Sequence, residues 1–143
     1  MSTTHFISGH LDLSNEEFNK YYKTNIDNAI INKESFVIGD AKGADSIAQQ
    51  YLAMNVTNYD STLLERVTIY HMCDKPRNNY GNFKTNGGFT NDDERDSQMT
   101  KDSGNDILWI RSLEEQKKRL GSKFNPNHIN GTTKNLIRRQ KIK

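Results

Sequence analysis

The stretch FVIGDAKGADSIAQQYL, from Phe36 to Leu52, contains the two patterns that decide the fold. It begins with apolar residues that end at Ile38, which is typical of a buried strand. From Ala44 onward the apolar residues recur at the spacing of one helical face, which predicts a helix. A strand joined to a helix by a short loop containing glycine is the repeating unit of an α/β protein.

The rest of the chain repeats this alternation. Strands are predicted at 5–8, 35–38, 67–70 and 107–110, and helices at 14–30, 44–52, 92–103, 112–120 and 132–140. Segment 73–90 shows neither the helical nor the strand spacing of apolar residues. It is predicted to be a long loop that either covers a ligand or is simply flexible. The pattern therefore predicts one α/β domain over residues 1–143. We expect a Rossmann-like three-layer sandwich whose mostly parallel sheet has about four to five strands.

Composition narrows the class of protein. The net charge is +2, from 20 basic and 18 acidic residues, which is too balanced to indicate nucleic-acid binding. Cys73 is the only cysteine, so an intrachain disulfide is excluded. No apolar run is long enough to cross a bilayer, and the first residues lack the pattern of a signal peptide. We expect a cytoplasmic protein without membrane contact, and the richness in Asn and Lys suggests a bacterial or viral source.

The loop inside the opening stretch is a candidate phosphate site. Glycines let another group approach the backbone closely, and a helix that begins there presents free N–H groups and positive potential to an anion. The candidate contacts are Gly39, Asp40, Lys42, Gly43 and Asp45. The alternative is an ordinary strand-to-helix turn, since the loop matches neither common glycine-rich phosphate motif.

Two further segments are predicted to lie at the same edge of the sheet, because ligands of parallel sheets bind outside the carboxyl ends of the strands. The loop after the first strand contributes Ser8, Gly9 and His10, and the start of the last helix contributes Gly131, Thr132, Thr133 and Asn135. For the last helix, the alternative is simple capping by a threonine.

The segment from Glu94 to Met99 completes the predicted site. Arg95 is suited to hold a phosphate or to stack on a base. Asp96 or Glu94 is suited to bind ribose hydroxyls or to act as an acid or base. The candidate catalytic carboxylates are therefore Asp40, Glu94 and Asp96, with Met99 as a further ligand contact. The alternative is an exposed helix with charge pairs one turn apart.

In this order the motifs resemble those of the SLOG superfamily of Rossmann-like nucleotide-binding proteins. Its small uncharacterised branch has motifs similar to SGxRD, GxARGAD, RNxxM and GTxNxxR. The matching segments here are Ser8–Asp12, Gly39–Asp45, Glu94–Met99 and Gly131–Asn135 with Arg138. The resemblance spans roughly residues 5 to 140. The superfamily includes LOG-type phosphoribohydrolases and sensors of nucleotide-derived signals, and its members often pair through helices.

The resemblance therefore implies a nucleotide-type small molecule as ligand and a homo-oligomer as the assembly. Asn135 stands where the phosphoribohydrolases have a catalytic glutamate, and an amide cannot act as a general base. We therefore expect binding of a nucleotide or nucleotide-derived signal, by a sensor or sequestering protein. N-glycosidic cleavage of nucleoside phosphates or ADP-ribose is the first alternative. A nucleic-acid module based on the basic residues around Arg138 is the second. Neither a metal nor a cofactor is expected.

Overall fold

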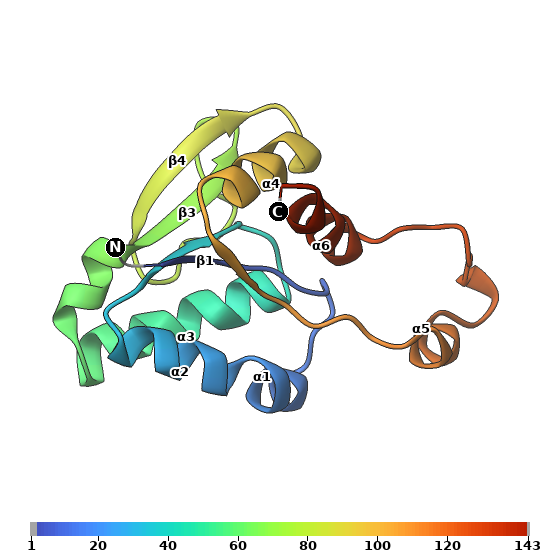
Figure 1. Ribbon diagram of the computed structural model, residues 1–143, viewed down its shortest axis with the longest axis horizontal. Coiled ribbons are helices and arrows are strands. Elements are labelled where there is room, and N and C mark those ends of the chain that lie inside the picture. The colour runs from blue at the N-terminus through green and yellow to red at the C-terminus, as the bar shows by residue number, and fades with distance from the viewer. Residues whose placement is uncertain (1–2, 143) are drawn as a thin grey trace.

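The computed structural model describes residues 3–142. Its five strands form one all-parallel sheet in the order β4-β3-β2-β1-β5. The strands are β1 (Thr4–Ile7), β2 (Ser35–Ile38), β3 (Val67–Met72), β4 (Lys84–Phe89) and β5 (Asn105–Ile107). Helices cover both faces of the sheet, so the predicted Rossmann-like three-layer α/β fold is confirmed (Figure 1).

The order of the strands places β1 between β2 and β5. It pairs with β2 on one side, in the register Thr4↔Ser35, and with β5 on the other, in the register His5↔Asn105. The chain moves outward from β1 through β2 and β3 to β4 and then returns to the far side of β1. The strand order therefore reverses between β1 and β5, and the segments that follow these two strands leave the sheet separately. Ligands bind at this position in sheets of this kind.

Three helices cover one face of the sheet: α1 (Asn15–Tyr21), α2 (Lys23–Ile31) and α3 (Ala44–Asn58). The predicted capping box is present at α1, because the side chains of Ser14 and Glu17 each accept a hydrogen bond from the N–H of the other residue. The larger core forms under these helices, and it includes Ile7, Ile38 and Ile69 from the sheet and Ile26 and Leu52 from the helices. A short 3-10 helix, η1 (Ser61–Arg66), leads from α3 into β3.

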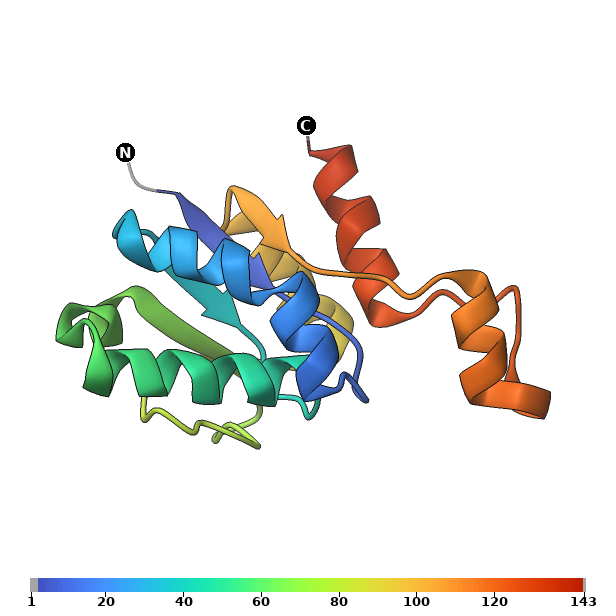
Figure 2. The same ribbon diagram turned by 90° about the horizontal axis from the view of Figure 1, so that it is seen from below.

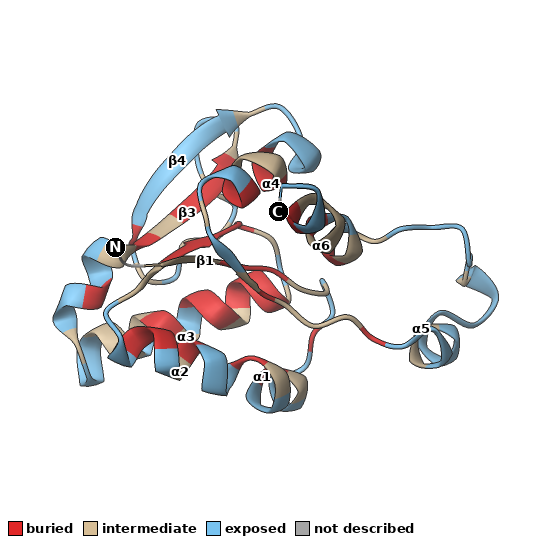
Figure 3. Cartoon of the chain, in the orientation of Figure 1, coloured by how far each residue is buried: buried red, intermediate tan, exposed pale blue. Residues whose placement is uncertain are grey.

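The other face carries α4 (Asp92–Lys101) and α6 (Gly131–Lys141). Its core is smaller and consists of Phe6, Val37, Tyr70 and Met99. Figure 3 shows the buried residues concentrated in the sheet and in the sides of the helices that face it. None of the helices in residues 3–142 combines the length and the apolar character needed to cross a membrane.

The predicted helix over 14–30 is in fact two helices that meet at Tyr22. The backbone dihedral angles of Tyr22 stay near helical values, but the helix is interrupted at this residue. The two helices still bury the apolar face that was predicted from the sequence. The Tyr22 side chain is fully buried and reaches the sheet, where its hydroxyl donates to the Ser8 carbonyl (2.8 Å) and accepts from the Trp109 N–H (3.1 Å). One side chain thus connects the segments that follow β1 and β5.

Substituting phenylalanine for Tyr22 should lower the free energy of unfolding by about 1–3 kcal/mol, because a buried carbonyl and a partly buried N–H lose their partner. Tyr51→Phe is the control, since the Tyr51 hydroxyl bonds Asp27 in a partly exposed position. Urea denaturation of both variants measures the difference. Equal losses would show that the junction between β1 and β5 does not depend on the Tyr22 hydroxyl.

Two further details differ from the sequence prediction. Segment 73–90, predicted as a loop, contains strand β4, which is exposed along most of its length and is held by pairing with β3. Gly87 is required there, since a Cβ would lie 2.1 Å from the His71 ring. The strand predicted at 107–110 is displaced to Asn105–Ile107, because the N–H of Trp109 bonds the Tyr22 hydroxyl instead of a neighbouring strand.

Residues 112–130 form an arm that extends away from the sheet (Figure 2). It contains α5 (Leu113–Leu120) and the short 3-10 helix η2 (Gly121–Lys123). No residue of α5 is buried; Leu113 of the arm is largely exposed, and Leu120 and Ile129 are about half exposed. The arm returns to the body of the protein at the start of α6.

Candidate functional site

A cleft of about 750 Å³ lies at the carboxyl edge of the sheet, between the loops after β1 and β2, the starts of α4 and α6, and the arm. Eleven of the predicted site residues line it: Ser8, Gly9, His10, Gly39, Asp45, Arg95, Asp96, Met99, Gly131, Thr132 and Asn135. Five predicted residues do not: Asp40, Lys42, Gly43, Glu94 and Thr133. The cleft therefore brings together segments that are distant in the sequence.

The residues outside the cleft wall have other contacts. Glu94 accepts a hydrogen bond from the Thr90 hydroxyl, and the Thr133 N–H donates to the side chain of Asn130. Lys42 is exposed to solvent. Gly43 has a φ of 75°, and a Cβ there would lie 2.4 Å from the His10 carbonyl oxygen. Glycine is thus needed at this position to let the loop after β1 pack against the start of α3.

Arg95 lies at the centre of a buried ion-pair cluster behind the cleft. Its guanidinium donates to Asp40 (2.8 Å) and to Asp96 (3.0 Å), and the residue is 5% exposed. Asp40 also accepts from the N–H and the side chain of Arg77, at 2.7 and 2.8 Å. Burial acts to raise the pKa of Asp40, but the Arg77 hydrogen bonds and the two arginine charges outweigh it and lower the pKa.

The two acidic residues of the cleft wall differ from Asp40. Burial raises the pKa of Asp96 although the charge of Arg95 opposes it. Asp45 is 8% exposed, accepts a hydrogen bond from the Ala41 N–H (3.1 Å), and has no ion pair among the described residues. Burial raises the pKa of Asp45 to about 7; the charge of Arg95 acts against this and that of Asp96 adds to it.

Three helices begin at or beside the cleft, and they differ in what they can offer an anion. The N–H of Ala44, at the start of α3, donates to the His10 carbonyl (3.1 Å). The first turn of α4 contains its own acidic residues, Asp92, Asp93 and Glu94. The first turn of α6 has no acidic residue, and open space surrounds Gly131. The start of α6 therefore keeps its N-terminal positive potential on the cleft side.

Asn135 lies in a chain of polar side chains beneath the start of α6. It is buried, accepts from Arg138 (2.6 Å), and its hydrogen bond to Asp96 acts to lower the pKa of that carboxyl. Arg138 also pairs with Asp93 at 3.0 Å. Asn135 therefore helps to position Asp96 in the cleft wall rather than acting as a base itself.

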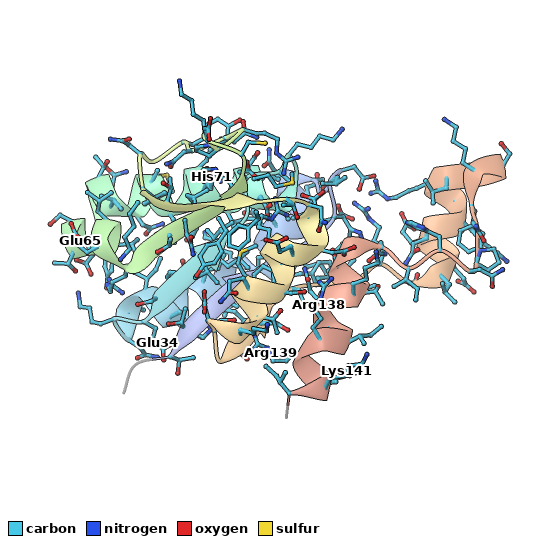
Figure 4. All side chains as sticks on the ribbon, turned by 90° about the horizontal axis from the view of Figure 1, so that it is seen from above. Glu34, Glu65, His71, Arg138, Arg139 and Lys141 are labelled. Atoms are coloured by element: carbon cyan, nitrogen blue, oxygen red, sulfur yellow. The ribbon has the colours of Figure 1, made fainter. Side chains whose placement is uncertain are left out.

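Figure 4 shows the basic side chains of α6, including Arg138, Arg139 and Lys141, on the helix beside α4. Arg139 is buried and donates to Asp106 (2.9 Å) and to the oxygens of Ser103. Arg138 and Arg139 are thus both engaged with the protein's own carboxylates.

The loop after β1 is fixed to the base of the arm by Arg111. This side chain is buried and pairs with Asp12 (2.6 Å) and Glu17 (2.8 Å), and its hydrogen bonds are the main cause that lowers the pKa of Glu17 to about 2. The Arg111 N–H also donates to Nε2 of His10 (3.0 Å). Burial and the Arg111 charge lower the pKa of His10, so its ring is neutral and cannot serve as a cationic phosphate contact.

Replacing Arg111 with methionine should release the arm, because the two carboxylates then lose the charge that ties α1 and the β1 loop to it. We expect amide hydrogen exchange in residues 112–130 to become faster by roughly tenfold or more, while the sheet stays protected. Arg119→Met is the control, since the contacts of Arg119 to the same acids are longer, at 3.4 and 3.5 Å. Unchanged exchange in the arm of the Arg111 variant would contradict this role.

Several lining residues were not predicted from the sequence. They are Arg77, Asn91, Asp92, Asp93, Arg111 and Arg119, together with Leu11, Leu120, His128 and Ile129 at the rim. Asn91 is the exception that carried a local signal, because Asn directly before an acidic helical turn is a common N-cap. Leu11, Leu120 and Ile129 line the cleft and are all about half exposed, so they give the cleft an apolar rim.

Within residues 3–142, no group of His, Cys, Asp and Glu side chains has the arrangement needed to hold a metal ion. The chain matches no protein-family model, and no curated protein or solved structure is significantly similar to it.

Proposed function

We propose that the cleft binds a phosphorylated nucleotide-type small molecule, with its phosphate at the start of α6. The observation that carries this proposal is the contrast among the three helix starts. The start of α3 donates to the His10 carbonyl, the start of α4 is neutralised by its own acidic residues, and of the three the start of α6 alone combines open space with no acidic first turn.

The remaining walls suit the rest of such a ligand. Asp45 and Asp96 line the wall between the helix starts, and their carboxyl groups would offer partners to ribose hydroxyls. Ser8 lines the same wall. The buried Ser8 hydroxyl has no hydrogen-bond partner within the described residues. The apolar rim of Leu11, Leu120 and Ile129 provides a surface for a base. The motif resemblance to the SLOG superfamily supports the same class of ligand.

The test is titration calorimetry with AMP, ADP-ribose and a cyclic nucleotide, using Gly131→Asp and Gly131→Asn as paired variants. No heavy atom lies within 4 Å of the position that a Cβ would take at Gly131, so both substitutions fit. An aspartate there adds a charge that stabilises the helix start but repels phosphate, so we expect the fold to be retained and binding to fall by roughly 100-fold. The neutral asparagine should cost much less. Absence of heat for all three ligands with the wild type would refute the proposal.

A second function, cleavage of the N-glycosidic bond, is favoured by one observation: Asp45 and Asp96 are two cleft carboxyls whose pKa is raised. A carboxyl protonated near neutral pH is suited to donate a proton to a departing base. Incubation of the protein with AMP or ADP-ribose, followed by chromatography for free adenine, tests this function. If ligand binds and no base appears over hours, the protein binds without cleaving.

A further inference from the structure

Among the described residues of the cleft wall, Asp45 is the buried carboxyl that forms no ion pair, although the charge of Arg95 acts on it from a greater distance. We propose that Asp45 holds a proton at neutral pH before ligand binds and meets an anionic, phosphate-bearing ligand as a neutral hydrogen-bond donor, so that binding is coupled to its protonation. This inference rests on the proposed function, because it needs an anionic ligand in the cleft. It adds a residue that selects ligands by charge and hydrogen-bonding pattern.

The first support is the count of buried charges. Asp40 is neutralised by Arg77 and Arg95, and Asp96 by its direct pair with Arg95. The exposed Asp92 also lies within 3.5 Å of both arginines. The two arginines are thus already shared among three carboxylates, and neither is left to form an ion pair with Asp45. An unpaired buried anion is costly, and the usual outcome is that the group takes up a proton.

The second support is that the described residues of the neighbouring elements supply no further positive charge to Asp45. On the side of the β1 loop, His10 is neutral because the Arg111 N–H occupies its Nε2. From the α1–α2 junction, the Tyr22 hydroxyl is engaged with Ser8 and Trp109. Burial, the largest cause, raises the pKa of Asp45 to about 7 in agreement with the charge count.

The third support is the geometry around Gly39. A Cβ on that residue would lie 2.6 Å from Oδ2 of Asp45 and 3.0 Å from the Arg95 guanidinium carbon, so both side chains close over the end of β2. The Ala41 N–H donates to the same Oδ2. The other oxygen, Oδ1, is therefore the atom that can carry the proton toward a ligand in the cleft.

A bound phosphate adds negative charge to this wall and favours the protonated form of Asp45. By linkage, affinity must then be highest when Asp45 is already protonated and must fall as the pH rises past about 7. The expected fall approaches about tenfold per pH unit, because one proton is bound with each ligand molecule.

The test is titration calorimetry of AMP and ADP-ribose against the wild type, Asp45→Asn and Asp92→Asn, between about pH 6 and pH 8. The asparagine at position 45 keeps an N–H donor and an acceptor but cannot titrate. Asp92 is the matched control, a lining carboxyl whose side chain is 63% exposed. Ionisation of the ligand phosphate affects all three proteins equally.

We expect the affinity of the wild type and of Asp92→Asn to fall by at least about fivefold more over this range than that of Asp45→Asn. Equal slopes for all three proteins, with binding intact, would overturn the inference and leave the proposed function standing. If no ligand binds, the proposed function fails instead. Carbon-detected NMR of the ligand-free protein then decides the protonation: a side-chain carboxyl that titrates near neutral pH and is missing from Asp45→Asn supports the inference, and its absence refutes it.

Discussion

Replacing Arg95 with methionine is expected to lower the free energy of unfolding by about 3–5 kcal/mol at neutral pH. Arg95 is buried, and removing it leaves the buried Asp96 without its ion-pair partner and leaves Asp40 with Arg77 alone. Methionine has a similar length and fills the space, so the loss measures the uncompensated carboxylates rather than a cavity. Urea denaturation measures the change.

Arg77→Met is the control for Arg95. Its side chain is 49% exposed and shares Asp40 with Arg95, so its removal leaves that carboxylate paired. We expect a loss of about 1 kcal/mol or less. The gap between the two variants should narrow in acid, where the carboxylates become protonated and no longer need a cation. Similar losses for both variants would show that burial of Arg95 does not determine its contribution.

Replacing Asp45 with asparagine is expected to raise the free energy of unfolding at neutral pH, by about 2–4 kcal/mol. The folded protein holds the Asp45 pKa at about 7, against an ordinary 3.8. Between these two values the unfolded chain releases the proton and the folded protein keeps it. Each pH unit in that window therefore costs the folded state about 1.4 kcal/mol, and the cost is constant above it.

Asparagine has no such cost, so the stability curves of the two proteins should nearly meet in acid and separate progressively between about pH 4 and pH 7. Urea denaturation at several pH values across this window measures the separation. Parallel curves would mean that Asp45 is ionised in the folded protein at the same pH as in the unfolded chain. A stabilising substitution in a cleft wall is also what a residue kept for binding rather than for folding should show.

The local pattern of the sequence accounts for most of the fold. The apolar run ending at Ile38 and the helical spacing after Ala44 correspond to β2 and α3. Such signals survive because each element buries one face, and burial imposes its period on the residues. β4 gives no such signal, since its residues are mostly exposed and the strand is held mainly by backbone pairing with β3.

The ends of elements were less predictable because side chains from elsewhere in the chain decide them. The apolar run at 107–110 continues past the end of β5, where the N–H groups of Trp109 and Arg111 bond the side chains of Tyr22 and His10. Trp109 then stacks on Tyr21 at a ring distance of 4.2 Å. Nothing in the sequence near Trp109 indicates partners that lie so far back in the chain.

The difference between local and long-range contacts also explains which residues of the site could be predicted. The predicted residues at Gly39 and Gly131 line the cleft because the carboxyl edge of a parallel sheet collects the loops in any such fold. Arg77 and Arg111 were missed because their partners, Asp40 and Asp12, lie far away in the sequence. The sequence also could not show that Asp40 would be paired while Asp45 would not, although the two residues are close neighbours in the chain.

The position of β1 between β2 and β5 also determines the order in which a growing chain can acquire its parts. β1, β2 and β3 with their three helices are synthesised as one block, and their shared core can form as soon as that block is available. The second neighbour of β1 arrives only with residues 105–107, and the start of α6 only at residue 131. Until then β1 has an unpaired edge, and the loops after β1 and β2 have no opposite wall. Synthesis of α6 is therefore the step that completes the cleft at the carboxyl edge of the sheet.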